Sequence, residues 1–170
     1  DVFTPGTGVL TYTVSDLTGN SASTTRTICV VDTQPPVITI LGDNPITLEC
    51  GAPYHDAGAT AFDTACGDLT AKIKTVSSLA PGPGTFGIYY SVCDASSHTG
   101  TACRTITVVD TIPPQITCPD DQVVVPDNDN SVRFEIPTAT DNAPGCTVTC
   151  NPPSGSALGA GLHTITCTAT

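Results

Sequence analysis

A 25-residue segment of the chain occurs twice, 78 residues apart, and this repeat constrains the fold more than any other feature. Residues 12–36 read YTVSDLTGNSASTTRTICVVDTQPP, and residues 90–114 read YSVCDASSHTGTACRTITVVDTIPP. Tyr12 aligns with Tyr90 and Arg26 with Arg104, without a gap. A weaker third copy lies at 164–170. A period near 80 residues is typical of a small β-sandwich module and is too long for a solenoid repeat.

The composition and the alternation of apolar residues predict an all-β fold. The chain has 30 Thr, 15 Val and 11 Ile, and these β-branched residues suit pleated sheets better than helices. Phe86, Ile88, Tyr90 and Val92 alternate along one predicted strand, and Ile106 and Val108 along the next, which predicts a hairpin. Further strands are predicted at 37–41, 46–49, 58–62, 72–77, 115–118, 122–125, 132–136, 146–150 and 163–169.

Charge and motif content exclude several function classes. Sixteen acidic and five basic residues give a net charge of -11, which argues against nucleic acid or an anionic membrane as a partner. No apolar run reaches the roughly 18–20 residues that span a bilayer, so no membrane insertion is expected. His55, His98 and His163 are widely spaced and no nucleophile motif accompanies them. We therefore predict no enzymatic activity and no cofactor, with calcium as the one alternative.

The predicted domain boundaries follow the repeated words V-V-D-T-x-P-P. Pro35 and Pro36 end one copy, and Pro113 and Pro114 end the next. Proline lacks an amide donor and stiffens the chain, so these junctions should end strands and hold adjacent modules at a fixed angle. We predict a partial unit of two strands at 1–32, a complete sandwich at 33–110, and a sandwich lacking its final strand at 111–170.

The residue patterns resemble two extracellular families. The segment from Asp32 to Asp110 resembles a bacterial-type immunoglobulin-like (Ig-like) repeat of surface proteins. The matching words are Asp32–Pro36, Cys50-Gly51 with Tyr54 and Asp56, Gly58-Ala59-x-Ala61, Gly67–Thr70, Pro83–Phe86 and Tyr90–Asp94. The segment from Asp110 to Thr170 resembles a hyalin repeat (HYR) domain, through Ile116–Pro119, Ala139–Asn142, Cys150 with Pro152–Ser156, and Gly161 leading to Ile165–Thr170. The resemblance implies tandem Ig-like sandwiches in an extracellular adhesive or structural protein.

Nine cysteines without a C-x-x-C motif indicate a disulfide-bonded chain from an oxidising compartment. Cys150 shares a face with Val148, and Cys167 with Ile165, which predicts a core disulfide that the HYR resemblance also implies. We also predict pairs between Cys50 and Cys66 and between Cys93 and Cys103. The residues left unpaired, or available for bonds between chains, are Cys29, Cys118 and Cys146. The HYR resemblance implies that Cys118 faces the missing last strand.

Carboxylates and amides concentrate near the predicted junctions and suggest a calcium site there. Asp16, Asn20 and Asp32 are assigned to one junction, and Asp94 and Asp110 to the next. Calcium prefers such hard oxygen ligands, and a bound ion would stiffen the array. The alternative is that these residues only form turns by bonding their own backbone.

Both ends of the chain are incomplete as Ig-like units, which gives the leading functional hypothesis. A strand from the next chain, Ser21–Asp32, would complete the HYR-like unit and build a head-to-tail filament from copies of this chain. The alternative is a covalent string of repeats of which this chain is one stretch. The other functions considered are an adhesion module that binds a glycan or a protein, and an accessory domain of a secreted hydrolase.

Overall fold

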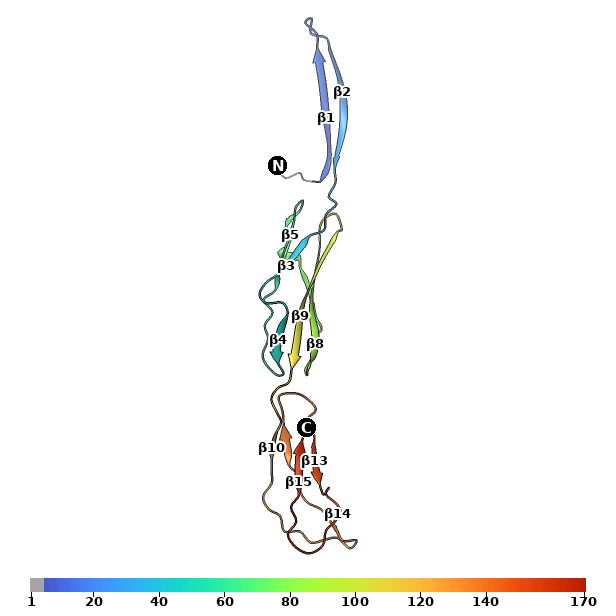
Figure 1. The fold of residues 1–170 in the computed structure, drawn as a ribbon. Coiled ribbons are helices and arrows are strands. Elements are labelled where there is room, and N and C mark those ends of the chain that lie inside the picture. The colour runs from blue at the N-terminus through green and yellow to red at the C-terminus, as the bar shows by residue number, and fades with distance from the viewer. Residues whose placement is uncertain (1–4) are drawn as a thin grey trace. The chain divides into compact units, whose positions relative to one another are not determined.

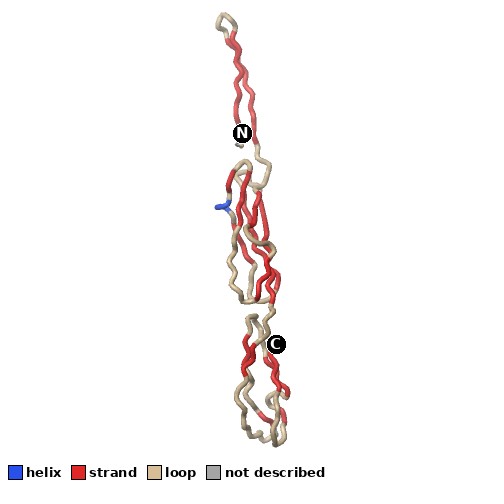
Figure 2. The backbone as a smooth tube through the Cα atoms, turned by 60° about the vertical axis from the view of Figure 1, so that its left-hand side comes forward, coloured by secondary structure: helices blue, strands red, loops and turns tan. Residues whose placement is uncertain are grey.

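The computed structural model describes residues 5–170 as strands and loops, with one short 3-10 turn, η1 (Thr70–Lys72) (Figure 2). The predicted fold class, all-β with Ig-like sandwiches, is confirmed. Within the described residues no helix is long and apolar enough to cross a membrane.

The first copy of the repeat lies in a hairpin that forms a sheet of its own. Strands β1 (Gly6–Ser15) and β2 (Ser21–Val30) pair antiparallel over their full length, from Ser15 opposite Ser21 to Gly6 opposite Val30 (Figure 1). Asp16 closes the turn, because its Oδ1 accepts the amides of Thr18 and Asn20 at 2.9 and 2.8 Å. Hydrogen bonds from the Asn20 and Thr18 side chains and backbone hold the pKa of Asp16 well below its usual range.

Contacts divide the chain into two compact units. The first contains residues up to 46, 55–78 and 87–105, and the second contains 47–54, 79–86 and 106–170. Two sheets lie in the region of the predicted complete sandwich, with strand orders β3-β5-β6 and β4-β9-β8-β7. Their strands are β3 (Val37–Ile40), β4 (Ile46–Glu49), β5 (Ala59–Asp63), β6 (Gly67–Asp68), β7 (Lys74–Ser77), β8 (Gly84–Cys93) and β9 (Thr99–Val109). The domain division at 32/33 and 110/111 stays a prediction.

The core of the first unit is small and apolar. Ala61, Leu69 and Val92 are each no more than 3% exposed, and Ile38, Cys66 and Ile73 pack against them. Val92 comes from the alternating row that the sequence predicts to face inward. Burial of such side chains stabilises the unit by about 1.5–3 kcal/mol for each large residue.

The second unit includes the HYR-like segment, which is built from short antiparallel pairs. β10 pairs with β12, β11 with β14, and β13 with β15. The bounds of these strands are β10 (Gln115–Thr117), β11 (Ser131–Val132), β12 (Thr138–Thr140), β13 (Val148–Asn151), β14 (Ser156–Ala157) and β15 (Thr166–Ala169).

The predicted strand at 122–125 is wrong. The segment is extended loop, with Val123 and Val125 102% and 88% exposed. β-branched residues favour a strand only where a neighbouring strand and an apolar surface are available. The segment has neither of these, so the sequence propensity has no structural effect here.

The proline junction before the Ig-like region packs tightly on β9. Pro36 is buried, and its carbonyl oxygen would lie 2.1 Å from a Cβ placed on Gly100. Glycine is therefore required at residue 100 for close approach of two backbones, as is common for glycines within strands. The position that corresponds in β2 is Ala22.

Gly100→Ala should destabilise the first unit by about 1–3 kcal/mol, the usual cost of forcing an extra carbon into a packed site. Thermal and denaturant unfolding, followed by circular dichroism, measures the effect. Gly8→Ala is the matched control, because a Cβ at Gly8 would meet nothing within 4 Å. Equal stability of the two variants would contradict the close packing of Pro36 on β9.

Candidate interaction surface

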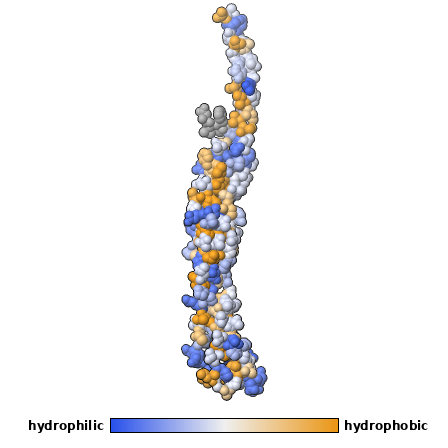
Figure 3. Space-filling model, in the orientation of Figure 1, coloured by the Kyte–Doolittle hydropathy of each residue, from blue (hydrophilic) through white to orange (hydrophobic). Residues whose placement is uncertain are grey.

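One face of the β1–β2 hairpin carries the residues of a sandwich core but lies open to solvent. We define the hairpin face as Leu10, Tyr12, Val14, Arg26 and Ile28, which the register places on the same side of the two strands. The four apolar members are between 40% and 70% exposed. Figure 3 shows apolar side chains along the hairpin. A contiguous apolar face of this kind is typical of an interaction site.

The same face is buried in the second copy of the repeat. The residues that correspond to the hairpin face at a spacing of 78 are Ile88, Tyr90, Val92, Arg104 and Ile106. Each of these is at most 4% exposed. The two hairpins therefore have equivalent inner faces, and the structure covers only the face that β8 and β9 form.

A buried arginine lies at the centre of the covered face. Arg104 is fully buried, and its Nε donates to Asp56 Oδ1 at 2.9 Å. Its terminal nitrogens donate to the backbone carbonyls of Leu41, Asp43 and Gly58. A buried charge is tolerated only when it is paired and hydrogen-bonded in this way.

Tyr90 belongs to the same cluster. Its hydroxyl donates to the Asp56 carboxylate at 2.7–2.8 Å, and Arg104 Nε lies 3.4 Å from the hydroxyl oxygen. Burial raises the pKa of Tyr90 above its ordinary value, although the hydrogen bond from Arg104 acts in the opposite direction. The cluster therefore joins β8 and β9 to the loops that precede β4 and β5.

In the lone hairpin the corresponding Tyr12 and Arg26 are both exposed. The surface that covers the equivalent Tyr90 and Arg104 supplies apolar side chains, the carboxylate of Asp56, and the backbone carbonyls of Leu41 and Gly58. A segment that resembles residues 37–63 has all of these features. The hairpin face is thus specific in its chemistry and not merely apolar.

The HYR-like segment has an open edge and a thin core. β15 pairs with β13 on one side only, so its other edge has no strand partner among residues 5–170. Among the residues described between 110 and 170, the buried apolar side chains are Val132 and Pro137. Cys150 and Cys167 lie opposite each other in the β13–β15 pair and form a disulfide. An unpaired edge is a ready template for another strand.

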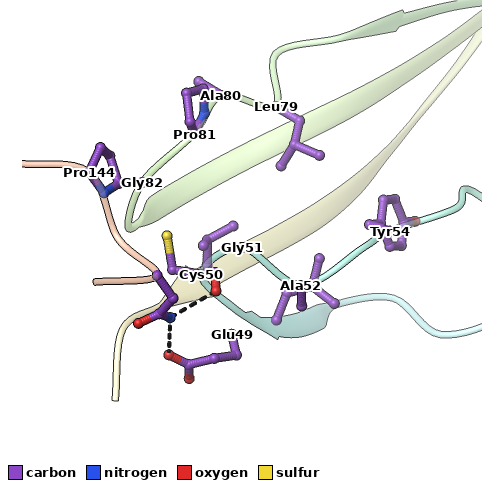
Figure 4. Close-up of a pocket in the computed structure, with 13 residues that line it drawn as sticks. Glu49, Cys50, Gly51, Ala52, Tyr54, Leu79, Ala80, Pro81, Gly82 and Pro144 are labelled. Atoms are coloured by element: carbon purple, nitrogen blue, oxygen red, sulfur yellow. Dashed lines mark hydrogen bonds between the residues drawn. The ribbon is translucent and has the colours of Figure 1, made fainter. Parts of the chain in front are cut away.

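A network at the end of β4 contacts the loop after β12. Glu49 accepts bonds from the amide and the hydroxyl of Thr111, both at 2.8 Å, and Asn142 Nδ2 donates to Glu49 and to the Cys50 carbonyl (Figure 4). The bonds from Thr111 hold the pKa of Glu49 below its usual range. Beside the network is a cavity of about 380 Å³, whose lining includes Tyr54, Leu79 and Asn142.

Two of the predicted cysteine pairs are absent, and both are corrections. Cys50 follows β4, and its backbone amide donates to the Val109 carbonyl. Cys66 lies in the turn between β5 and β6, which belong to the other sheet. The thiols of both residues are free. Cys93 and Cys103 are also free. The amide of Asp94 donates to the His98 carbonyl, and this register sets Cys93 opposite Thr99, about 13 Å along β9 from Cys103.

The predicted unpaired cysteines are free thiols in the structure. Cys29 and Cys118 are exposed, and Cys146 is half-buried. They stay candidates for bonds between chains.

The acidic residues predicted to form two calcium sites are grouped differently in the structure, which is a further correction. Asp16 and Asn20 meet at the tip of the β1–β2 hairpin, but Asp32 follows the other end of β2. Ten residues of strand span roughly 30 Å, so these residues cannot share an ion. In the same way Asp94 precedes β9 and Asp110 follows it. Instead, Asp32 lies beside Asp94.

The junction prolines differ in burial. Pro36 is buried, Pro114 is half-buried, and Pro35 and Pro113 are exposed. Sequence reasoning missed the roles of Asp56 and Asn142, which bond residues 48 and 93 positions away. The recurrence of Arg26 as Arg104 was the available signal, because an arginine within an apolar strand face needs a buried acceptor.

The fold is that of an all-β protein with Ig-like modules, and the family models that match the chain define its class. Residues 38–108 match the family model described as "Bacterial surface protein, Ig-like domain", and residues 109–170 match the HYR domain. The predicted order of the two domains is confirmed. Both families are non-catalytic adhesion modules, and the chain is extracellular or at the cell surface.

The curated relatives include two proteins named hyalin. The chain is 34% identical over 155 residues to hyalin of Strongylocentrotus purpuratus and 35% identical over 156 residues to hyalin of Lytechinus variegatus. Each match covers 83% of this chain, but only 13% and 29% of those hyalins. Among solved structures, the lipoprotein BT2262 of Bacteroides thetaiotaomicron aligns at 26% identity with a TM-score of 0.40, covering 45% of this chain and 39% of that protein.

Proposed function

We propose that the chain is a structural building block of an extracellular filament or surface appendage, in which Ig-like modules complete one another's sheets. The observation that carries the proposal is the hairpin face, which is exposed on β1 and β2 although its equivalent on β8 and β9 is fully buried. Covering this face with a segment like residues 37–63 would remove its apolar side chains from water.

The free energy available at the hairpin face is large enough for stable assembly. Burial of a large aliphatic or aromatic side chain stabilises by about 1.5–3 kcal/mol, and the face has four such residues. A carboxylate placed like Asp56 would also pair with Arg26. Part of this gain is lost to the cost of association, so the prediction concerns assembly at modest concentration rather than an extreme affinity.

The open edge of β15 gives the second half of the contact. A donated strand would pair its backbone amides and carbonyls with β15, as in other cases of β-strand addition. The donor that the repeat suggests is residues 21–32, which is the last strand of its own module. A contact of this kind between unlike surfaces does not close on itself, so it propagates into a fibre.

Leu10→Asp should abolish assembly, because it places a charge at the centre of the hairpin face. Light scattering across a concentration series, together with electron microscopy, measures the loss. Val9→Asp is the matched control: Val9 is 62% exposed and lies on the opposite side of the same strand. We expect the control to assemble like the unmodified chain.

Two results would contradict the proposal. Assembly of Leu10→Asp at the unmodified level would show that the hairpin face is not the contact. A chain that stays monomeric at every concentration would favour the alternative, an adhesion module that binds a glycan or a protein. Retention of that monomer on an array of glycans would then support the alternative directly.

A further inference from the structure

Three aspartates from separate turns direct carboxylate oxygens toward one region of the first unit. Asp32 follows β2, Asp63 ends β5, and Asp94 follows β8. In each residue Oδ1 accepts backbone amides of its own turn: from Gln34 for Asp32, from Ala65 and Cys66 for Asp63, and from Ser96 and His98 for Asp94. The second oxygen of Asp94 lies 3.0 Å from Nδ1 of His98.

The second oxygens of the other two carboxylates are buried without a hydrogen-bond partner. Asp63 is 98% buried, since its exposed fraction is 2%, and its Oδ2 accepts no bond. Asp32 Oδ2 is likewise buried and unpartnered. Among residues 5–170 no arginine or lysine forms an ion pair with either carboxylate. Buried carboxylates without a cation are strongly disfavoured, so a bound positive ion would stabilise this arrangement.

The neighbouring donors identify the class of ion. Asp32, Asp63 and Cys66 each offer a ligand atom within 4.8 Å of the others, and Asp32, Asp94 and His98 form a second such group. His98 Nδ1 lies 3.0 Å from Asp94 Oδ2, and such carboxylate–imidazole pairs commonly orient metal-binding histidines. Calcium takes oxygen ligands alone, whereas zinc is bound by thiolate, imidazole and carboxylate.

We propose that Asp32, Asp63 and Cys66 bind a borderline divalent ion such as Zn²⁺, with the Asp94–His98 pair beside it. Cys66 binds as the thiolate, so its proton is released to solvent when the ion enters. The ion would cross-link the segment that follows β2 to the turns after β5 and β8. This site is independent of filament assembly.

Titration of the reduced chain with Zn²⁺, in competition with a chromophoric chelator, tests the site. We expect one tight equivalent, and at least a tenfold weaker affinity in each of Asp32→Asn and Asp63→Asn. An asparagine keeps the Oδ1 acceptor of the turn, and thermal unfolding without metal checks that each variant is folded. With Co²⁺ as the probe, Cys66→Ser should abolish the thiolate-to-metal charge-transfer absorption.

Two control variants separate this site from adventitious binding. Asp16→Asn alters the equivalent turn one repeat earlier, where both carboxylate oxygens accept bonds from Thr18 and Asn20, and should leave the zinc affinity unchanged. Cys118→Ser removes an exposed thiol and should also have no effect. Unchanged affinity in Asp32→Asn and Asp63→Asn would overturn the site. Binding of Ca²⁺ without Zn²⁺ would overturn the assignment of Cys66 as a ligand.

Discussion

Arg104→Ala should destabilise the Ig-like region by about 3–5 kcal/mol, which is the usual cost of removing one partner of a buried ion pair. The change leaves the Asp56 carboxylate and the Tyr90 hydroxyl without their central partner, and leaves the carbonyls of Leu41, Asp43 and Gly58 without this donor. Since a domain of this size is stable by roughly 5–15 kcal/mol, much of the margin would be lost. Chemical denaturation followed by tyrosine fluorescence measures the change.

Arg26→Ala is the matched control, because Arg26 is the equivalent residue of the preceding repeat and is exposed. Its effect should stay within about 0.5 kcal/mol, as for most surface substitutions. The comparison is made at protein concentrations below the onset of assembly, so that the hairpin face is uncovered. Similar losses in the two variants would show that burial of the arginine has no special role.

Replacement of Cys150 and Cys167 by serine should destabilise the HYR-like segment by about 3 kcal/mol. The estimate follows from the entropy of closing a loop of 17 residues in the unfolded chain. The effect on this segment should be severe, because Val132 and Pro137 are its described buried apolar residues and hydrophobic burial contributes little else. Differential scanning calorimetry would show a lowered or missing transition for the segment.

The transition of the Ig-like region provides an internal reference in the same experiment. It should not move, because the disulfide lies wholly between β13 and β15. Cys118→Ser is the control for loss of a thiol as such, and should leave both transitions in place. A double serine variant that unfolds like the unmodified chain would refute the claim that this bond sustains the segment.

The fold could be predicted largely from local patterns. Alternation from Phe86 to Val92 and again at Ile106 and Val108 correctly located β8 and β9, because side chains on a strand point to opposite faces in turn. The same argument placed Cys150 and Cys167 on inner faces. The extended but unpaired segment at 122–125 shows where the argument stops, since alternation and propensity do not supply a neighbouring strand.

The grouping of side chains from separate elements could not be predicted in this way. Cys93 and Cys103 share a hairpin, but their separation depends on a register that only the turn at Asp94 determines. Asp32 meets Asp63 and Cys66 because separate turns converge in the folded unit. Such proximity depends on how sheets pack and leaves no periodic signal in the sequence.

The contacts of Arg104 have a consequence for the order of folding. They join residues 46–63 positions apart, whereas every pair in the β1–β2 hairpin lies within 24 positions. Local hairpins form in roughly 1–10 μs, and contacts of high sequence separation form more slowly. The hairpin of β8 and β9 is therefore expected to present its apolar face only until the earlier strands dock. During that interval the uncovered face of β8 and β9 is a site at which partly folded chains can associate wrongly.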